Sequence, residues 1–382
     1  MGKVYILNDG YNLRVISNLR EFESLRDVWN KLAYKQGVLT PFLCFDWFKI
    51  WLEHFLKDNK LLILLLYQGE KVVAIAPFIE LREKFKRILA NKIELIGNTY
   101  SPIRSILFDE LDETCKAICT EHIFDYLLNN YKKWDIIDLN PIADEDDYKT
   151  VIKEIIKNSS YKNIEDFCFE NWYMDGINYS GDDYLNQRSK PFRKELRKRK
   201  RQLEEKGQLD FVVIKDSNGI DRFADYYYEI YAKSWKKQEL IGPNFHRDLA
   251  KMAAEKGWLR LGFLFLDETP IASSFTIVSD GTAYLLKSAY DEQYKDYGPG
   301  TLIRTEMIKY VIDMDKIKKI DLGQGSESYK RFFVSHKRDM KEIFIFNKSL
   351  KGKFLALLSI RILPFVRRHR TIRQIKNILL KK

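Results

Sequence analysis

The sequence is poor in the residues that build metal sites and disulfide frameworks. It has four cysteines in 382 residues, in apolar or mixed segments without paired spacing: Cys44, Cys115, Cys119 and Cys168. Its five histidines are scattered, with no His-x-x-x-His pair among them: His54, His122, His246, His336 and His369. Zinc sites need such ligands at short spacings, and disulfide frameworks are typical of small secreted domains. We therefore expect no metal site and a reduced, cytoplasmic protein.

Long apolar runs are also absent. The longest, such as residues 61–67 (LLILLLY), are far shorter than the roughly 20 residues that a membrane-spanning helix needs. The opening residues MGKVYILNDG contain no apolar leader core, and Ile6 does not fit the myristoylation pattern. The sequence has neither a Gly-x-Ser-x-Gly elbow nor a Walker loop. These absences argue against a transmembrane protein, a serine hydrolase of that type and a Walker-type nucleotide hydrolase.

What the sequence does have is positive charge and a large apolar fraction. The net charge is +11 with a pI near 9.1, and much of the charge lies in residues 188–201 and 351–382. A hydrophobic fraction of 45% with 14% aromatic residues is typical of a folded globular protein, and 382 residues suffice for two domains. Basic proteins attract anionic partners, which include nucleotides, nucleic acids and membrane surfaces.

Two similar successions of elements follow each other along the chain. In each, helical spacing of apolar residues precedes a strand–turn–strand pattern, and a buried-type strand comes later. Three places in the first set match the second at a constant offset of 198: Leu61 with Leu259, Gly69 with Asp267, and Val73-Ala74 with Ile271-Ala272. Residues 137–139 match 320–322 at an offset of 183. The pattern predicts a duplicated α/β domain.

Residues 283–333 form the central part of the second set of elements. They read as a strand, the turn Gly298-Pro299-Gly300-Thr301, an amphipathic helix, a second strand and a Gly-rich loop that carries Tyr329 and Lys330. A turn with exposed backbone N–H groups that leads into a helix N-terminus can hold phosphate. Between residues 97 and 134 the first set has no Gly-x-Gly turn before a helix. We therefore expect one active site, in the C-terminal half.

Two basic segments flank this unit. Residues 188–206 predict a helix whose apolar positions face a core, with Arg193 and Arg197 on neighbouring faces. This helix is either a solvated inter-domain helix or an arm that neutralises substrate phosphates, and an RNA contact is the least favoured alternative. Residues 351–382 predict a basic amphipathic helical tail. The tail either packs on the domain or a partner subunit, or touches an anionic membrane surface peripherally.

The run KSAYDEQYKDYGPGTLI, followed by IDLGQGSESYKRFF, resembles the Fem/BioF-like branch of the GNAT acyltransferases, and the resemblance covers nearly the whole chain. It implies two tandem GNAT-like domains of the α/β class (α+β type), each a twisted mixed sheet flanked by helices. We expect a first domain over residues 1–185 without a phosphate loop, a second over 186–350 with an acyl-CoA site, and a basic tail over 351–382. The donor is acyl-CoA in most of the branch and aminoacyl-tRNA in the peptidoglycan-bridge enzymes.

The resemblance also implies roles for particular residues. The pyrophosphate of the donor would be held by Tyr297, Gly298, Gly300, Thr301 and Leu302, although this loop departs from the usual GNAT pattern. Tyr329-Lys330 matches the aromatic-Lys pair at the Fem reaction centre, so Lys330 would stabilise the oxyanion. Asp291 or Asp321 would take the proton of the amine, and a tyrosine would protonate the leaving thiolate: Tyr329, Tyr290, Tyr294 or Tyr297. The predicted substrate contacts are Arg193, Arg197, Lys287, Tyr290 and Trp235.

Each assignment has a structural alternative. The tyrosines also fit half-buried aromatics on strands or turns, and Lys330 also fits a surface lysine. Asp321 fits a cap of the loop that follows its strand. Lys287 stands in an apolar strand and is either an edge residue or a substrate contact. Trp235 also fits a core position.

The resemblance and the basic helix together indicate N-acyl transfer from acyl-CoA to a nucleotide-linked amino sugar, for a surface polysaccharide such as lipopolysaccharide. No metal cofactor and no nucleic-acid partner are expected. The rival enzyme is an aminoacyl-tRNA-dependent ligase on a peptidoglycan precursor, although the coiled-coil insertion frequent in such Fem enzymes is not visible. The rival of another class is a non-catalytic anion- or RNA-binding module. A cytoplasmic location is expected, with peripheral contact to the inner face of the membrane as an alternative.

Overall fold

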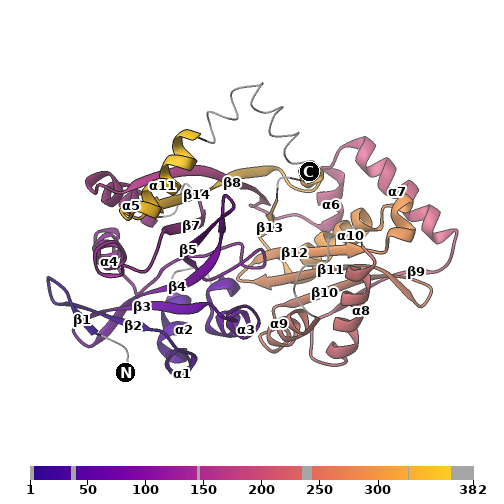
Figure 1. Ribbon diagram of the computed structural model, residues 1–382. Helices are drawn as coiled ribbons and strands as arrows, with labels where there is room; N and C mark the ends of the chain where they lie inside the picture. The colour runs from indigo at the N-terminus through magenta and orange to yellow at the C-terminus, as the bar shows by residue number, and fades with distance from the viewer. Residues whose placement is uncertain (1–3, 36–39, 144–146, 235–242, 326, 363–382) are drawn as a thin grey trace.

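The chain forms one twisted sheet that runs through two similar halves and is flanked by helices (Figure 1). This computed structural model describes residues 4–35, 40–143, 147–234, 243–325 and 327–362. Within these residues no helix is long and apolar enough to cross a bilayer.

The N-terminal half contains the first eight strands. Its elements are β1 (Val4–Ile6), β2 (Tyr11–Ile16), α1 (Leu19–Glu23), α2 (Arg26–Lys35), the 3₁₀ turn η1 (Pro41–Leu43), α3 (Phe45–Phe55), β3 (Lys60–Gln68), β4 (Lys71–Phe85), β5 (Ile88–Leu95), β6 (Leu107–Phe108), α4 (Glu113–Asp125), the π-helical turn η2 (Tyr126–Asn130), β7 (Ile136–Ile142), α5 (Asp147–Asn158) and β8 (Lys162–Met174).

The C-terminal half opens with two helices before its strands begin. Its elements are α6 (Gly181–Asn186), α7 (Lys190–Glu204), β9 (Leu209–Ile214), α8 (Ile220–Ala232), α9 (Pro243–Glu255), β10 (Leu259–Leu266), β11 (Thr269–Ser279), β12 (Thr282–Tyr290), the 3₁₀ helix η3 (Glu292–Tyr297), α10 (Pro299–Asp315), β13 (Lys319–Gln324), the 3₁₀ helix η4 (Ser328–Phe332), β14 (His336–Phe346), α11 (Leu350–Leu357) and the π-helical turn η5 (Leu358–Ile362).

The two halves repeat one core arrangement. The hairpin β3–β4 corresponds to β10–β11, and both turns contain a residue in the left-handed region, Gly69 (φ 61°) and Asp267 (φ 54°). The parallel pair β5–β7 corresponds to the parallel pair β12–β13. Residues matched by the two sequence offsets therefore lie in matched strands, and the tandem fold predicted from the sequence is confirmed.

The last strand of each half pairs with the other half. β14 pairs antiparallel with both β7 and β8, and β8 pairs antiparallel with β13. The order across the sheet is β1-β2-β3-β4-β5-β7-β14-β8-β13-β12-β11-β10-β9, with β6 paired to β4. Main-chain hydrogen bonds therefore join the halves, and the domain limits 1–185, 186–350 and 351–382 stay a prediction.

An aromatic cluster joins the same two halves through side chains. Phe42, Trp47 and Tyr100 of the first half pack in one buried cluster with Tyr227 and Phe245 of the second. The Nε1–H of Trp47 donates to the Ser101 hydroxyl at 3.0 Å. Large aromatic side chains bury much apolar area and so stabilise such a joint. The loop of the first half that carries Tyr100 is thereby held against the second half.

The other segments read from the sequence are present with small differences. α4 is followed directly by η2, and the basic helix expected over 188–206 is α7, capped by the side chain of Ser189. The described part of the basic tail is α11 and η5, and residues 363–382 lie outside the described residues. The long strands β8 and β14 were not predicted, because charged residues interrupt their apolar pattern.

Candidate functional site

The parallel strands β12 and β13 pair over only three residues and then separate. Their last matched pair is Tyr284 with Asp321. Beyond this pair β12 stays bonded to β11, and β13 stays bonded to β8. The register of β12 against β11 shifts after the pair Leu285–Thr276, so Leu286 forms a bulge without a partner residue in β11. The separation opens the sheet at the junction of the two halves.

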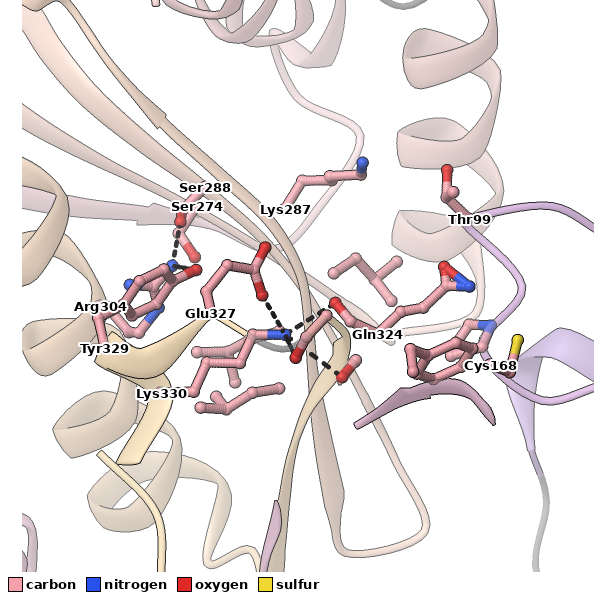
Figure 2. Close-up of a pocket in the computed structure, with 17 residues that line it drawn as sticks. Thr99, Cys168, Ser274, Lys287, Ser288, Arg304, Gln324, Glu327, Tyr329 and Lys330 are labelled. Atoms are coloured by element: carbon pink, nitrogen blue, oxygen red, sulfur yellow. Dashed lines mark hydrogen bonds and ion pairs between the residues drawn. The ribbon is translucent and has the colours of Figure 1, made fainter. Parts of the chain in front are cut away.

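A cavity of about 460 Å³ occupies this opening (Figure 2). β12 and the chain that follows β13 form two of its walls, α10 lies at one end, and β8 with a loop of the first half lies at the other. The lining residues are Thr99, Pro102, Cys168, Phe169, Ser274, 285–288, Arg304, 322–325, Glu327, Tyr329 and Lys330. Cavities of this size bind small molecules or one end of a larger ligand.

Lys330 is buried in the wall formed by the loop after β13, with 4% of its surface exposed. Its ammonium group donates to the carbonyl oxygens of Gln324 at 2.7 Å and Gly325 at 3.2 Å, and lies 3.2 Å from the Glu327 carboxylate. Burial lowers the pKa of Lys330 below the ordinary lysine value, although Glu327 opposes the shift. A lysine has three N–H donors, so these contacts use them all. Lys330 therefore holds the Gly-rich loop in a fixed shape.

Glu327 lies one turn before Lys330 and points into the cavity. Figure 2 shows its carboxylate beside the Lys330 ammonium, and 49% of the side chain is exposed. Among the described residues that line the cavity, it is the one with a carboxylate. A carboxylate that is open to a bound amine can accept its proton. Glu327 is therefore the best-placed general base of this site.

Arg304 of α10 lies at the end of the cavity nearest the predicted phosphate loop. Its Nη2 donates to the Ser288 hydroxyl at 2.6 Å and to the Tyr329 hydroxyl at 3.3 Å. Its guanidinium carbon also lies 4.6 Å from the centre of the Tyr329 ring and 5.1 Å from that of Phe333. These contacts fix a permanent cation and a phenol at one end of the cavity.

The opposite end is polar and is formed with the first half of the chain. Figure 2 shows Thr99, Cys168 and Gln324 there, with Lys287 reaching from β12. The Lys287 ammonium lies 4.8 Å from the centre of the Tyr100 ring. Burial raises the pKa of Cys168 to about 12, so this thiol does not supply a thiolate nucleophile. In the part of the chain that the structure describes, no three His, Cys, Asp or Glu side chains gather into a metal-binding group.

α10 begins beside the cavity with an N-terminus that no side chain caps. Its N-cap is Gly298, which adopts a left-handed conformation (φ 58°, ψ 47°). The next glycine, Gly300, allows close approach of Tyr290, because a Cβ there would lie 2.9 Å from the ring carbon Cδ1. Arg304 is one helical turn further on. The N-terminal end of a helix dipole attracts anions, so a phosphate bound here would lie next to the cavity.

The basic helix α7 lies along this N-terminus. Arg199 packs so closely on Gly298 that a Cβ on the glycine would lie 2.1 Å from its Nη1, and its Nε donates to Glu195 at 2.8 Å. Lys200 lies 4.0 Å from Glu306 of α10. Arg199 of α7 therefore stands at the start of α10, and Lys200 lies about two turns further along that helix.

The structure brings many of the predicted residues together in two adjoining places. Lys287, Tyr329 and Lys330 line the cavity. The predicted pyrophosphate loop forms the end of η3 and the first turn of α10: Tyr297, Gly298, Gly300, Thr301 and Leu302.

The two predicted bases do not line the cavity. Asp291 is buried and caps η3, where its carboxylate accepts from the Gln293 N–H at 3.0 Å. Asp321 is also buried, and it accepts from the Asn171 side chain at 2.8 Å and the Gly323 N–H at 2.7 Å. Both carboxylates therefore hold turns, which is the alternative noted for Asp321.

The predicted substrate contacts other than Lys287 lie elsewhere. Arg193 donates to Asn186 at 3.2 Å, and Arg197 is exposed on α7. Tyr290 packs on Gly300 and outside the cavity lining. Trp235 lies outside the described residues.

Several site residues were missed by reading the sequence. Glu327 stands inside the SESYKRF motif, three residues before Lys330, so one helical turn of spacing was an available signal. Arg304 stands one turn after the Gly-Pro-Gly-Thr turn, and Arg199 lies in the basic helix already singled out. Thr99 and Cys168 had no such signal, because they reach the cavity only through the packing of the first half.

Comparison with known proteins agrees with this geometry. Residues 190–331 match the family described as Acetyltransferase (GNAT) domain. No curated protein matches the sequence.

Solved structures show the same fold at low sequence identity. FemX superposes with a TM-score of 0.55 at 11% identity, over 86% of this chain and 98% of its own. L-PGS from Bacillus licheniformis gives 0.50 at 10% identity, over 90% of this chain and 96% of its own. A tandem GNAT protein from the clavulanic acid biosynthesis pathway gives 0.45 at 10% identity, over 87% and 98%. Residues 190–331 therefore carry the sequence pattern of a GNAT domain, and the chain as a whole has the fold of FemX.

Proposed function

We propose that this protein is an N-acyltransferase that moves an acyl group from acyl-CoA to the amino group of a nucleotide-linked amino sugar. The observation that carries the proposal is the cavity between β12 and β13, which adjoins the uncapped N-terminus of α10. A donor with phosphates at one end and a reactive carbonyl at the other fits this pair of sites. Acyl-CoA is such a donor, and the matched GNAT domain contains the start of α10 and most of the residues that line the cavity.

The donor's phosphates belong at the first turn of α10. The dipole of this helix end attracts an anion, and Arg199 adds a cation beside it. Arg304, one turn along, faces the cavity and lies between the phosphate end and the reacting end of the donor. Arg193 and Arg197, which were predicted as substrate contacts, are not part of this proposed donor site.

The reacting carbonyl belongs where the strands separate. The bulged Leu286 lines the cavity without a partner residue in β11, so its N–H is our candidate for stabilising the oxyanion. Lys330 uses its N–H donors on the loop, so we assign it a positioning role. Glu327 accepts the proton of the attacking amine. Tyr329, held by Arg304, supplies the proton of the leaving thiolate.

The acceptor belongs at the polar end formed with the first half. Thr99, Gln324 and Lys287 offer hydrogen-bond donors and acceptors that suit sugar hydroxyls and an anionic nucleotide. Both substrates of the proposed reaction are soluble, cytoplasmic metabolites, which suits a cytoplasmic enzyme of surface polysaccharide synthesis.

An aminoacyl-tRNA-dependent ligase is the second candidate. The fold of FemX and the exposed basic side chains of α7 favour it. In that case the phosphates at α10 belong to the end of the RNA, and the cavity takes the aminoacyl group.

A thiol-release assay over a set of acyl-CoA donors and UDP- or dTDP-amino sugars tests the proposal. We expect thiol release that needs both an acyl-CoA and an amino sugar nucleotide. Turnover with charged tRNA and none with any acyl-CoA would replace the favoured donor. A non-catalytic anion-binding module predicts instead that Gly300→Val and Lys330→Met leave the protein's function unchanged.

A further inference from the structure

The last helix of the described chain is apolar on two opposite faces. Its inner face, which includes Leu355 and Ala356, packs on the strand residues Phe85, Phe344 and Phe346. Its outer face carries large apolar side chains at the helical spacing i, i+4, i+7: Leu350 (88% exposed), Phe354 (49%) and Leu357 (45%). A surface helix normally presents polar residues on the side away from the core. α11 therefore presents an apolar stripe to the outside.

This stripe is part of a concentration of exposed apolar side chains. Ile360 (38% exposed) and Ile362 (40%) continue it in η5. Five of the fifteen large apolar side chains that are exposed in the described chain thus lie within residues 350–362. Single exposed apolar residues are ordinary, but a cluster of them marks a surface that binds something.

Positive charge surrounds the stripe. Lys353 and Arg361 are exposed on α11 and η5 themselves. The tip of the β4–β5 hairpin lies beside the helix, because Phe85 packs in one cluster with Leu355, and this tip exposes Lys84, Lys86 and Arg87. Residues 363–382, which follow directly, contain seven further Lys and Arg residues and no acidic residue.

We propose that the outer face of α11 and the tip of the β4–β5 hairpin form a docking surface for an anionic phospholipid bilayer. An apolar stripe bordered by cations is the pattern of a helix that lies in the plane of a membrane interface. Each cation near a negatively charged leaflet adds attraction that is screened within a Debye length. The proposal stands apart from the acyl transfer proposed above, because neither surface touches the cavity.

The charges favour a bilayer over a second copy of the chain. A symmetric contact between two copies would bring each apolar stripe, with its rim of lysines and arginines, against an identical rim. Like charges brought together in this way oppose association. Anionic head groups neutralise the same rim while the acyl chains cover the apolar side chains.

Flotation of the full-length protein with vesicles tests the proposal. We expect it to float with vesicles of phosphatidylcholine mixed with phosphatidylglycerol, and to remain at the bottom with phosphatidylcholine alone. Raising the salt concentration weakens the binding. The triple variant Leu350→Ser, Phe354→Ser, Leu357→Ser lowers vesicle partitioning at least about tenfold, since three apolar side chains no longer enter the interface.

Two further variants test whether vesicle binding depends on the apolar stripe of α11 and on the nearby positive charge. The control Val4→Ser, Ile6→Ser, Met314→Ser also removes three exposed apolar side chains, at 62%, 88% and 63% exposure, and leaves partitioning unchanged. The variant Lys84→Gln, Lys86→Gln, Arg87→Gln lowers it about tenfold or more at low salt. Circular dichroism confirms that each variant is folded.

Several outcomes would overturn the proposal. Equal flotation with and without phosphatidylglycerol would remove the role of charge. Unchanged flotation of the α11 triple variant, with loss of flotation when residues 363–382 are deleted, would make the tail the anchor. A dimer in sedimentation that the α11 triple variant converts to a monomer, with no flotation, would identify a second copy as the occupant.

Discussion

In each half of the molecule two parallel strands pair over three residues and then separate, β5 from β7 in the first half and β12 from β13 in the second. The last matched pairs are Glu94 with Asp138 and Tyr284 with Asp321, so the two aspartates occupy equivalent positions. The backbone thus makes the same opening twice. The side chains decide what each opening becomes.

In the first half a network of charged side chains includes the last matched pair, Glu94 with Asp138. The Lys92 ammonium lies 2.5 Å from Glu83, 3.0 Å from Glu94 and 2.9 Å from Asp138. Burial acts to lower the pKa of Lys92, but Asp138 and Glu94 outweigh it and raise that pKa above the ordinary value. Lys330, in the second half, is surrounded mainly by carbonyl groups and has a lowered pKa. One lysine is thus locked in an ion-pair network, and the other shapes the wall of a cavity.

The N-termini of α4 in the first half and α10 in the second half also differ. α4 is capped by Asp112, whose carboxylate accepts from the Cys115 N–H at 2.7 Å and has its pKa lowered by that bond. Its own carboxylate therefore satisfies the end of α4 that would attract an anion. α10 starts at Gly298 with no capping side chain. The same fold thus carries a structural joint in one half and a candidate active site in the other.

Removing the central cation of the first opening should have the largest effect. Lys92→Met leaves the carboxylates of Glu94 and Asp138 facing each other without their ammonium partner, and losing one member of a buried ion pair typically costs about 3–5 kcal/mol. Urea unfolding measures this loss. Lys116→Met, which breaks an exposed pair with Glu113 on α4, is the matched control and should change stability by less than about 1 kcal/mol. Equal losses in the two variants would show that the network does not hold the opening together.

Removing the Glu327 carboxylate from the second opening should lower the rate of turnover. Glu327→Gln keeps the shape of the side chain but cannot accept a proton, so we expect kcat to fall about 10²–10⁴-fold. KM for the donor should stay nearly the same, because the phosphate end of the site is untouched. Glu204→Gln, at the exposed C-terminal end of α7, is the control. If Glu327→Gln raises KM and leaves kcat unchanged, Glu327 contacts substrate without moving its proton.

Most of the fold follows from local signals in the sequence. The hairpins β3–β4 and β10–β11 were predicted because apolar strands flank short turns. The start of α10 was predicted because the sequence Gly-Pro-Gly-Thr is typical of a turn that leads into a helix. The equivalence of Asp138 and Asp321 was visible as a repeated Ile-Asp-Leu. Each of these depends on residues that are close together in the chain.

The rest depends on contacts between distant residues. Nothing near Thr99 or Cys168 indicates that they line the same cavity as Glu327, because only the packing of the first half against the second brings them there. Asp321 was one of two carboxylates predicted as the base, but its environment is set by Asn171, 150 residues away. A sequence pattern shows which residues can titrate, and only packing decides which of them face a cavity.

An acidic residue at the start of α10 should make it resemble α4. Thr301→Asp places a carboxylate in the first turn of α10, where it repels the donor's phosphates and takes up the free helix end, so we expect KM for acyl-CoA to rise about tenfold or more. Thr301→Asn has the same shape without the charge and should change KM much less. Steady-state kinetics at varied donor concentration compares the two. Equal effects of both variants would place the donor's phosphates elsewhere.

The smallest predicted effect is on the pH dependence of stability, and it comes from the excess of carboxylates around the first opening. Burial and the neighbouring Asp138 and Asp166 raise the pKa of Glu342 to about 7, above its ordinary value of 4.5. The folded state therefore binds a proton more tightly than the unfolded chain, and this contribution to stability is complete below pH 4.5 and disappears as the pH rises through 7. Glu342→Gln stays neutral, so it should match the wild type at pH 4.5 and exceed its free energy of unfolding by about 1 kcal/mol at pH 8, a figure reduced for partial exposure.

Glu165, a neighbouring carboxylate, should show the opposite pH dependence of stability. The hydrogen bond from Lys153 lowers the pKa of Glu165 below its ordinary value, so the charged form of Glu165 stabilises the fold and this contribution is lost as the pH falls. Glu165→Gln should therefore be less stable than the wild type at pH 8, where Glu342→Gln is more stable. Urea unfolding of both variants at the two pH values measures the contrast. If both variants change the free energy of unfolding in the same direction at pH 8, the carboxylates around the first opening are not in excess. The contrast with the lysine-lined cavity of the second half then does not hold.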